Sequence, residues 1–402
     1  MRKPRSVLLF SGLLLILLFA GLLMWGLPFL TGKNELAASV DVFGSKVESA
    51  QVEKIIEEGT ITLGEVTQPY QVLLVRVLGG DYAGIPLEVE YGKFQQRPGL
   101  RLFKEGDRIF VTIDVRADGV VNAYYTDTDR SLALWVLFGL FVVAIIWMGR
   151  RKGIGALISL AFSLWVIIGF IVPSILEGKD PVAVSLAGSA ILLGASLYIT
   201  YGWNLKTHSA VFSIFISLAL TGALSVLFVN YARLSGFGDE NALFLVQVSA
   251  RTINLQGLFL GGMIIGALGV LDDLVTSQTA VAFELHNVDD KLGFSEIFYR
   301  SMRIGQDHIA ATVNTLFLAY TGASLPLLLL FALGRGNIPY LLNAEFVTEE
   351  IVRTLVGSIG LILAVPISSM VAAYVAKHSH QLGDWYDYLG GAGIESHHPH
   401  SH

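Results

Sequence analysis

The chain has 402 residues, of which 53% are hydrophobic and 15% are charged, and its mean hydropathy is +0.61. Soluble domains carry about 25% charged residues, so this composition excludes an ordinary soluble protein and predicts a membrane protein. The sequence contains no cysteine, which excludes disulfides, thiol nucleophiles and cysteine-ligated metals. The chain has a net charge of −6, and its Lys and Arg residues form no concentrated basic cluster. A nucleic-acid partner is therefore not expected.

Apolar runs long enough to cross a lipid bilayer recur along the chain. The first, after a basic N-terminus, is too long for a signal peptide and predicts an uncleaved anchor. Together the runs predict a polytopic α-helical bundle of about eight transmembrane helices. The candidate spans are Val7–Leu30, Leu132–Met148, Gly153–Leu176, Pro181–Tyr201, Ser209–Tyr231, Leu255–Leu271, Ala310–Leu333 and Ile351–Val375.

The distribution of Lys and Arg predicts the orientation of the chain in the membrane. With the N-terminus in the cytoplasm, the inside segments hold eleven basic residues and the short outside loops hold four. We therefore expect a bacterial inner-membrane protein with both termini cytoplasmic and residues 31–130 outside. The predicted organisation is an anchor at 1–30, a soluble domain at 31–130, a seven-helix membrane domain at 131–377 and a His-rich cytoplasmic tail at 378–402.

The soluble segment, residues 31–130, reads as β structure and carries a net charge of −5. Gln71–Leu78, Ile85–Tyr91, Arg108–Val115 and Gly119–Tyr125 alternate apolar and polar residues and are separated by glycine-containing turns. A segment of this size with about five strands predicts a small β-barrel of the OB type. Its acidic character favours a structural or partner-binding role over nucleic-acid binding.

The first polar cluster of the membrane half lies in Gly266–Leu285, GALGVLDDLVTSQTAVAFEL. Three local structures fit it: a continuous helix, a helix broken at its glycines whose carbonyls coordinate a cation, and a span that ends at Leu271 before a solvated helix capped by the acids. Ionisable groups at membrane depth usually serve a function. The candidate site residues here are Asp272, Asp273, Thr276, Ser277, Gln278 and Glu284.

The second cluster lies in Arg303–Thr321, RIGQDHIAATVNTLFLAYT, at the start of the seventh candidate span. Asp307 and Asn314 share one helix face, and the Asn314 amide, inside the apolar run, needs a hydrogen-bonding partner. That partner is either another helix, as interhelical glue, or a ligand. The candidate site residues here are Arg303, Asp307, His308, Thr312, Asn314 and Thr315.

These two motifs resemble the paired signature of the YibE/F-like bacterial membrane proteins. The resemblance implies an N-terminal anchor, an extracytoplasmic β-rich domain and a polytopic bundle. Gln306 stands where the family pattern has Arg, so no anion contact is assigned to it. The residues that match the family motifs are Asp272, Asp273, Gln278, Glu284, Gly305, Asp307, His308, Asn314 and Thr315.

The two clusters predict an ion or solute pathway, and hence a transporter or exporter coupled to Na⁺ or H⁺ through the carboxylates, or holding a divalent cation. Arg303 or Arg251 would hold an anionic solute. No organic cofactor is expected. The alternative is an envelope scaffold whose outer β domain recruits a partner. An aspartyl enzyme is not expected, because adjacent acids on a helix point about 100° apart. The expected partners are the lipid bilayer, the solute or ion and another copy of the chain.

Overall fold

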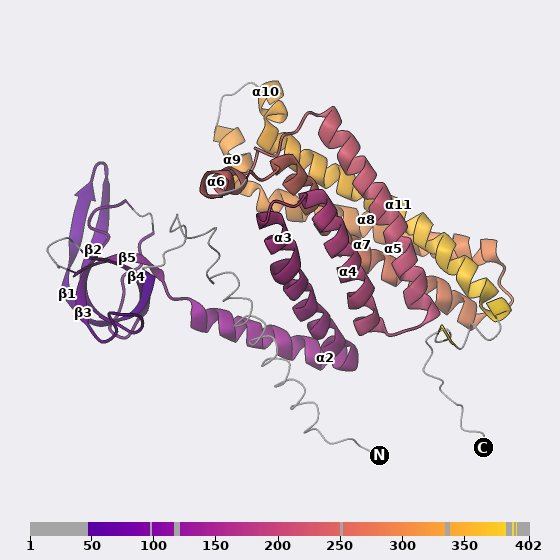
Figure 1. Cartoon of the computed structure of the whole chain (residues 1–402), viewed down its shortest axis with the longest axis horizontal. Coiled ribbons are helices and arrows are strands. Elements are labelled where there is room, and N and C mark those ends of the chain that lie inside the picture. Colours follow the sequence, from indigo (N-terminus) through magenta and orange to yellow (C-terminus); the bar gives the residue numbers. More distant parts are fainter. Residues whose placement is uncertain are drawn as a thin grey trace, which may run out of the picture. The chain divides into compact units, whose positions relative to one another are not determined.

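The structure is a computed structural model that describes residues 47–96, 99–115, 121–249, 252–333, 338–382, 388, 389 and 391. The chain divides into two compact units, one of residues 37–144 and one that contains residues 145–402. Figure 1 shows strands in the first unit and helices in the second. The predicted anchor at 1–30, Arg251 and most of the His-rich tail lie outside the described residues.

The first unit contains a five-stranded antiparallel sheet in the order β3-β2-β1-β4-β5. The two edge strands, β3 and β5, also contact each other, and Figure 1 shows the strands curling into a ring. A small antiparallel sheet domain is thus confirmed, while its identification with the OB type stays a prediction. The strands are β1 Val47–Leu63, β2 Val66–Val77, β3 Pro86–Tyr91, β4 Arg108–Val115 and β5 Val121–Thr128.

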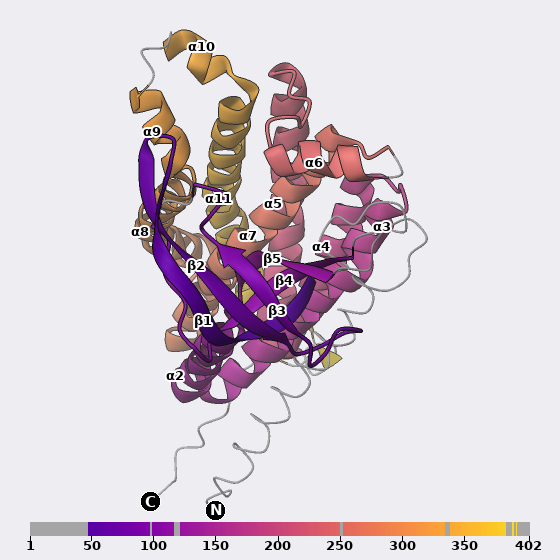
Figure 2. The same cartoon turned by 90° about the vertical axis from the view of Figure 1, so that its left-hand side faces the viewer.

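Strand β1, with 17 residues, has no counterpart among the predicted strands. Its pairing with β2 shifts register between Val52 and Lys54 and again between Ile55 and Glu57. Each bulge adds a residue to one strand and so breaks the two-residue alternation on which strand prediction depends. The outer halves of β1 and β2 form a long two-stranded ribbon, which Figure 2 shows beside the rest of the sheet.

Six helices among the described residues are long and apolar enough to cross a membrane. The backbone of Arg150, with φ 48° and ψ −123°, divides α2 at the predicted loop between the second and third spans. The described helices are α2 Ser131–Val166, the π-helical turn η1 Ile167–Ile171, α3 Val172–Leu176, α4 Pro181–Tyr201, α5 Leu205–Tyr231, α6 Glu240–Val248, α7 Leu255–Val288, α8 Phe294–Ala323, α9 Leu325–Leu333, α10 Ile338–Asn343, α11 Glu345–His378 and η2 Ser379–Leu382.

Two predicted spans differ from the structure. Helix α7 does not end at Leu271 and is not broken at its glycines: it runs unbroken for 34 residues from its N-cap, Asn254. The predicted span Ala310–Leu333 is interrupted at Ser324, where α8 ends and α9 begins. Pro326 in the first turn of α9 lacks the N–H that a continuous helix needs, which explains the interruption.

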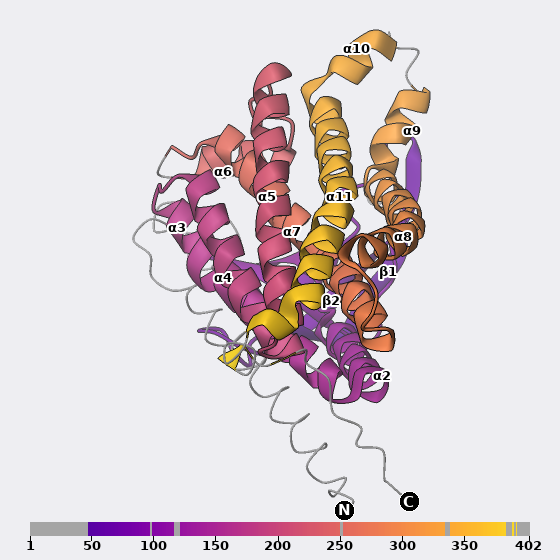
Figure 3. The ribbon, with the colours of Figure 1, turned by 90° about the vertical axis from the view of Figure 1, so that its right-hand side faces the viewer.

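Helix α7 lies at the centre of the bundle and packs against α4, α5, α8 and α11. Figure 3 shows α5, α7 and α11 side by side, with α8 next to α11. Small residues allow the close approach: a Cβ at Gly360 of α11 would collide with Thr221 of α5, and one at Gly261 of α7 would collide with Ser185 of α4. Glycine, serine and threonine are typical of such interfaces between membrane helices.

Candidate functional site

The two polar motifs meet at Gln278 of α7. Its Nε2 donates to the carbonyl oxygen of Ser301 in α8 at 2.7 Å and to Oγ of Ser369 in α11 at 2.7 Å. The side chain is 1% exposed. We call Gln278, Ser301, Gly305 and Ser369 the Gln278 junction, because these four residues join three helices through one buried amide.

Gly305 makes this junction possible. A Cβ at this position would lie 2.9 Å from Nε2 of Gln278 and would collide with Val365 of α11. Glycine therefore lets α8 approach α7 and α11 closely enough for the amide to reach the Ser301 carbonyl. The junction thus brings Gln278 of the first motif and Gly305 of the second into direct contact.

Asp272 is the predicted site residue with the most unusual surroundings. It is the eighteenth of the 34 residues of α7, about 26 Å along the helix axis from the first. The side chain is half-buried, and its Oδ1 is buried with no hydrogen-bond partner among the described residues. Buried carboxylate oxygens are normally paired, so an unpaired one calls for an explanation.

Helix α4 shows that Asp272 lies within the depth of one membrane span. Pro181 and Ser185 of α4 lie beside Gly257 and Gly261 of α7, so the two helices start together and run in the same direction. Helix α4 has 21 residues, the length of one bilayer crossing. Asp272 is fifteen residues beyond Gly257 and is therefore inside that length.

Three hydroxyl groups accompany Asp272 and the junction. Oγ1 of Thr276 donates to the backbone carbonyls of Asp272 and Asp273, at 2.8 and 3.1 Å. Thr279 and Ser301 are fully buried, and their hydroxyl oxygens have no partner among the described residues. Thr279 and Ser301 were not predicted as site residues.

The other candidates of the first motif are less buried. Asp273 and Glu284 are exposed and Ser277 is half-buried. Glu284 interacts electrostatically with Lys206 at the start of α5. The two adjacent acids thus have different surroundings, since Asp272 turns toward the bundle and Asp273 away from it.

The candidates of the second motif lie along α8, mostly on its outer side. Thr315 donates to the carbonyl of Ala311 at 2.9 Å, and so bonds within its own helix. Within the described part of the chain, no hydrogen bond or ion pair joins these side chains to Asp272 or Asp273. Arg303, Asp307, Asn314 and Thr315 are exposed, and His308 and Thr312 are half-buried.

A ladder of hydroxyl groups along α5 was not predicted. Each side chain donates to the carbonyl four residues earlier, at 2.7 to 2.9 Å, and each is buried. The spacing of four is visible in the sequence and could have revealed a shared helix face. The ladder consists of Ser209, Ser213, Ser217, Thr221 and Ser225.

Thr221 and Ser225, the last two residues of the ladder, line a cavity of about 30 Å³ between α5, α7, α8 and α11. This volume holds about one water molecule. Thr221, Ser225, Tyr320 and Arg353 supply its polar lining. Glycines of α7 and α11 leave the space open. Arg353 is held by an ion pair with Glu350 at 2.6 Å.

Two glutamates of α11 fix the loop that follows α5, a contact that the sequence did not reveal. Oε1 of Glu345 accepts from the backbone N–H of Ser235 at 2.5 Å and from its hydroxyl at 2.6 Å. Oε1 of Glu349, which is 2% exposed, accepts from the N–H of Gly238 at 3.2 Å. The two carboxylates therefore hold the loop after α5 against α11 and use their hydrogen bonds within the protein.

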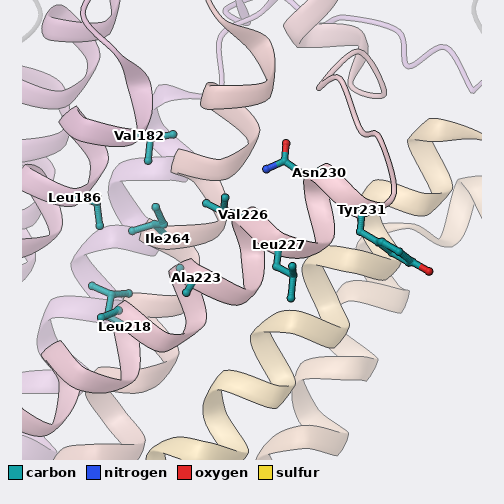
Figure 4. A pocket seen from close by; sticks show the side chains of 11 residues that line it. Val182, Leu186, Leu218, Ala223, Val226, Leu227, Asn230, Tyr231 and Ile264 are labelled. Carbon is teal, nitrogen blue, oxygen red and sulfur yellow. The ribbon is translucent and has the colours of Figure 1, made fainter.

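A larger hollow of about 940 Å³ lies on the side of α4, α5 and α7 (Figure 4). Its lining is apolar apart from Asn230 and Tyr231, which Figure 4 shows together at one end. Two neutral polar side chains at one end, with no charged group, do not make a site for an ion. Among the described residues, no three His, Asp or Glu side chains come together in a way that could hold a metal ion.

Comparison with known proteins agrees with the membrane bundle. The sequence profile of the YibE/F-like protein family matches residues 137–378, which contain the described helices from within α2 to the end of α11. No curated protein and no solved structure matches the chain. Because the profile covers more than half of the sequence and includes both polar motifs, the chain belongs to the YibE/F-like family.

Proposed function

We propose that this membrane protein transports a small solute or an ion through its helical bundle, with Asp272 as the carboxylate that binds the coupling proton or cation. The observation that carries the proposal is the buried, unpartnered Oδ1 of Asp272 within the depth of one membrane span. A carboxylate costs free energy at such depth and is usually retained for a function.

Neighbouring oxygens support this role for Asp272. Thr276 lies one helical turn beyond it, and a further turn along α7 the Thr279 hydroxyl has no hydrogen-bond partner among the described residues. Carboxylate and hydroxyl oxygens suit Na⁺, H⁺ or a divalent cation. The cavity beside Arg353, whose lining includes Val270 two residues before Asp272, adds a second group of polar side chains along α7.

The proposal includes the membrane and the orientation. We place the protein in the bacterial inner membrane, with both termini in the cytoplasm and the β unit outside. The excess of Lys and Arg in the predicted inside segments supports this orientation.

The experiment compares two adjacent acids. Full-length protein is reconstituted in liposomes that contain a pH-sensitive dye, and proton flux is followed after a Na⁺ or pH gradient is imposed. Asp272→Asn should abolish coupled flux, whereas Asp273→Asn, the same chemical change at the exposed neighbour, should retain most of it. Equal flux in Asp272→Asn and the unsubstituted protein would remove Asp272 from the mechanism.

An envelope scaffold is the second candidate, and the Gln278 junction favours it. There the polar side chain of Gln278, from the first motif, serves helix packing, since its amide donates to Ser301 and Ser369 within the protein. The long β1–β2 ribbon would then recruit the partner. Deleting residues 57–70 from the full chain should abolish co-purification of envelope proteins for a scaffold and leave proton flux intact for a transporter.

A further inference from the structure

The exposed side of α8 carries charged and amide side chains that lipid does not satisfy, although α8 runs at membrane depth. Its Gly305 lies level with Gln278 of α7, and its Leu316 and Tyr320 line the cavity with Gly262 and Gly266. Helix α8 therefore passes along the same stretch of α7 that contains Asp272. Yet α8 is not among the six helices apolar enough to cross a membrane.

Part of the exposed side of α8 follows a seven-residue repeat. Five of the exposed residues between Arg303 and Phe317 are spaced alternately by four and three, and these five form one stripe opposite the side of Gly305 and Leu316 that packs in the bundle. We call this stripe the α8 outer face. It consists of Arg303, Asp307, Ala310, Asn314 and Phe317.

From this face we propose that the protein forms a two-fold symmetric dimer in the membrane through α8, with Asn314 of one copy hydrogen-bonded to Asn314 of the other. A carboxamide both donates and accepts, so it can satisfy a copy of itself across a two-fold axis. In lipid the same amide would have no partner, at a cost in free energy.

The charged residues of the α8 outer face also complement those of a second copy. Arg303 and Asp307 lie one turn apart with opposite charges, so in a two-fold pair each guanidinium can reach the carboxylate of the other copy. The small Ala310 next to Asn314 lets the two helices approach closely. The seven-residue spacing is the one that keeps two helices in contact over several turns.

The apolar N-terminal segment of this chain is a poorer occupant of the face. Residues 7–30 contain no charged and no amide side chain, so they would leave Asp307 and Asn314 without partners. This inference is independent of the proposed transport, because association of copies is measured without any flux.

Disulfide cross-linking in native membranes tests the dimer, since the chain has no cysteine of its own. Phe317→Cys and Leu355→Cys are matched: both side chains are 56% exposed, and both lie near the level of the cavity lined by Leu316 and Gly357. A disulfide needs Cα atoms within about 7 Å. Oxidation should give a dimer of twice the chain mass for Phe317→Cys and leave Leu355→Cys monomeric.

A second experiment measures how strongly two copies associate in a lipid bilayer. Energy transfer between labelled copies in liposomes should show that Asn314→Leu weakens the dimer about tenfold, with Asn314→Gln partly restoring it. The proposal is overturned if Phe317→Cys stays monomeric, if both cysteine variants cross-link equally, or if the adduct contains a different protein. Unchanged association of Asn314→Leu would overturn the role of Asn314.

Discussion

Gly305 of α8 lies directly against the side-chain amide of Gln278 in α7, so close that a Cβ at Gly305 would be 2.9 Å from Nε2 and 3.0 Å from Oε1. The sequence separates these residues by a loop and parts of two helices, and the fold makes them neighbours. The spacing between three helices therefore depends on the absence of one methyl group.

Gly305→Ala should destabilise the bundle, because the added methyl group also collides with Val365. Overpacking of this kind costs about 1–3 kcal/mol. Thermal unfolding of the full chain in detergent measures the loss. Gly322→Ala, on the same helix with nothing within 4 Å, is the control and should unfold like the original protein. Equal stability of the two variants would contradict the packing described.

Gln278 and Ser369 should behave as a coupled pair. The hydrogen bond between them is buried, and removal of either side chain leaves the other polar group without this hydrogen-bond partner. In a double-mutant cycle of Gln278→Ala and Ser369→Ala, the free energies of unfolding should depart from additivity by about 1 kcal/mol. Simple additivity would show that the bond does not stabilise the bundle.

Glu349→Ala should loosen the loop after α5. The variant removes the acceptor of the Gly238 N–H, and hydrogen exchange at this amide should become faster by about tenfold. Glu350→Ala, which removes a more exposed ion pair with Arg353, should leave the exchange rate of Gly238 unchanged. A faster rate in both variants would point to general unfolding of α11.

Gln71 should be important for the β unit. Its Oε1 accepts from the N–H of Phe103 at 2.8 Å and its Nε2 donates to the Phe103 carbonyl at 3.1 Å, both in the interior. Gln71→Leu leaves both backbone groups unpaired, at a cost of about 1–3 kcal/mol. Hydrogen exchange over residues 99–115 of the full chain should become faster. Gln51→Leu, which removes a surface bond to Gly106, should have a smaller effect.

The sequence predicted those helices and strands whose pattern of apolar and polar residues is regular from end to end. Helices α4, α5 and α11 follow from long apolar runs, and strands β3 and β4 follow from regular alternation. Strand β1 could not be found this way, because two bulges shift its register. The interruption at Ser324 depended on Pro326, which the apolar run around it concealed.

The sequence could identify the polar residues of the candidate site, but it could not predict how their side chains are placed relative to one another. Helical periodicity alone could not decide whether α7 continued beyond Leu271, and it could not distinguish the surroundings of Asp272 from those of Asp273. Ser369, a partner of Gln278, lies 91 residues away in an apolar helix. Contacts of this kind come from packing between helices, which no short segment of sequence encodes.

The hydroxyl ladder of α5 has a mechanical consequence. Its donors are all used inside α5, so the face that α5 presents to α11 consists of short side chains whose hydrogen bonds do not cross the interface. Sliding α5 along α11 would thus break no hydrogen bond of the ladder. Helices α7, α8 and α11, by contrast, are pinned at Gln278. The bundle therefore combines three helices joined at Gln278 with a neighbour, α5, that is held against α11 by close packing at Gly360 and by the bonds of Glu345 and Glu349 to the loop after α5.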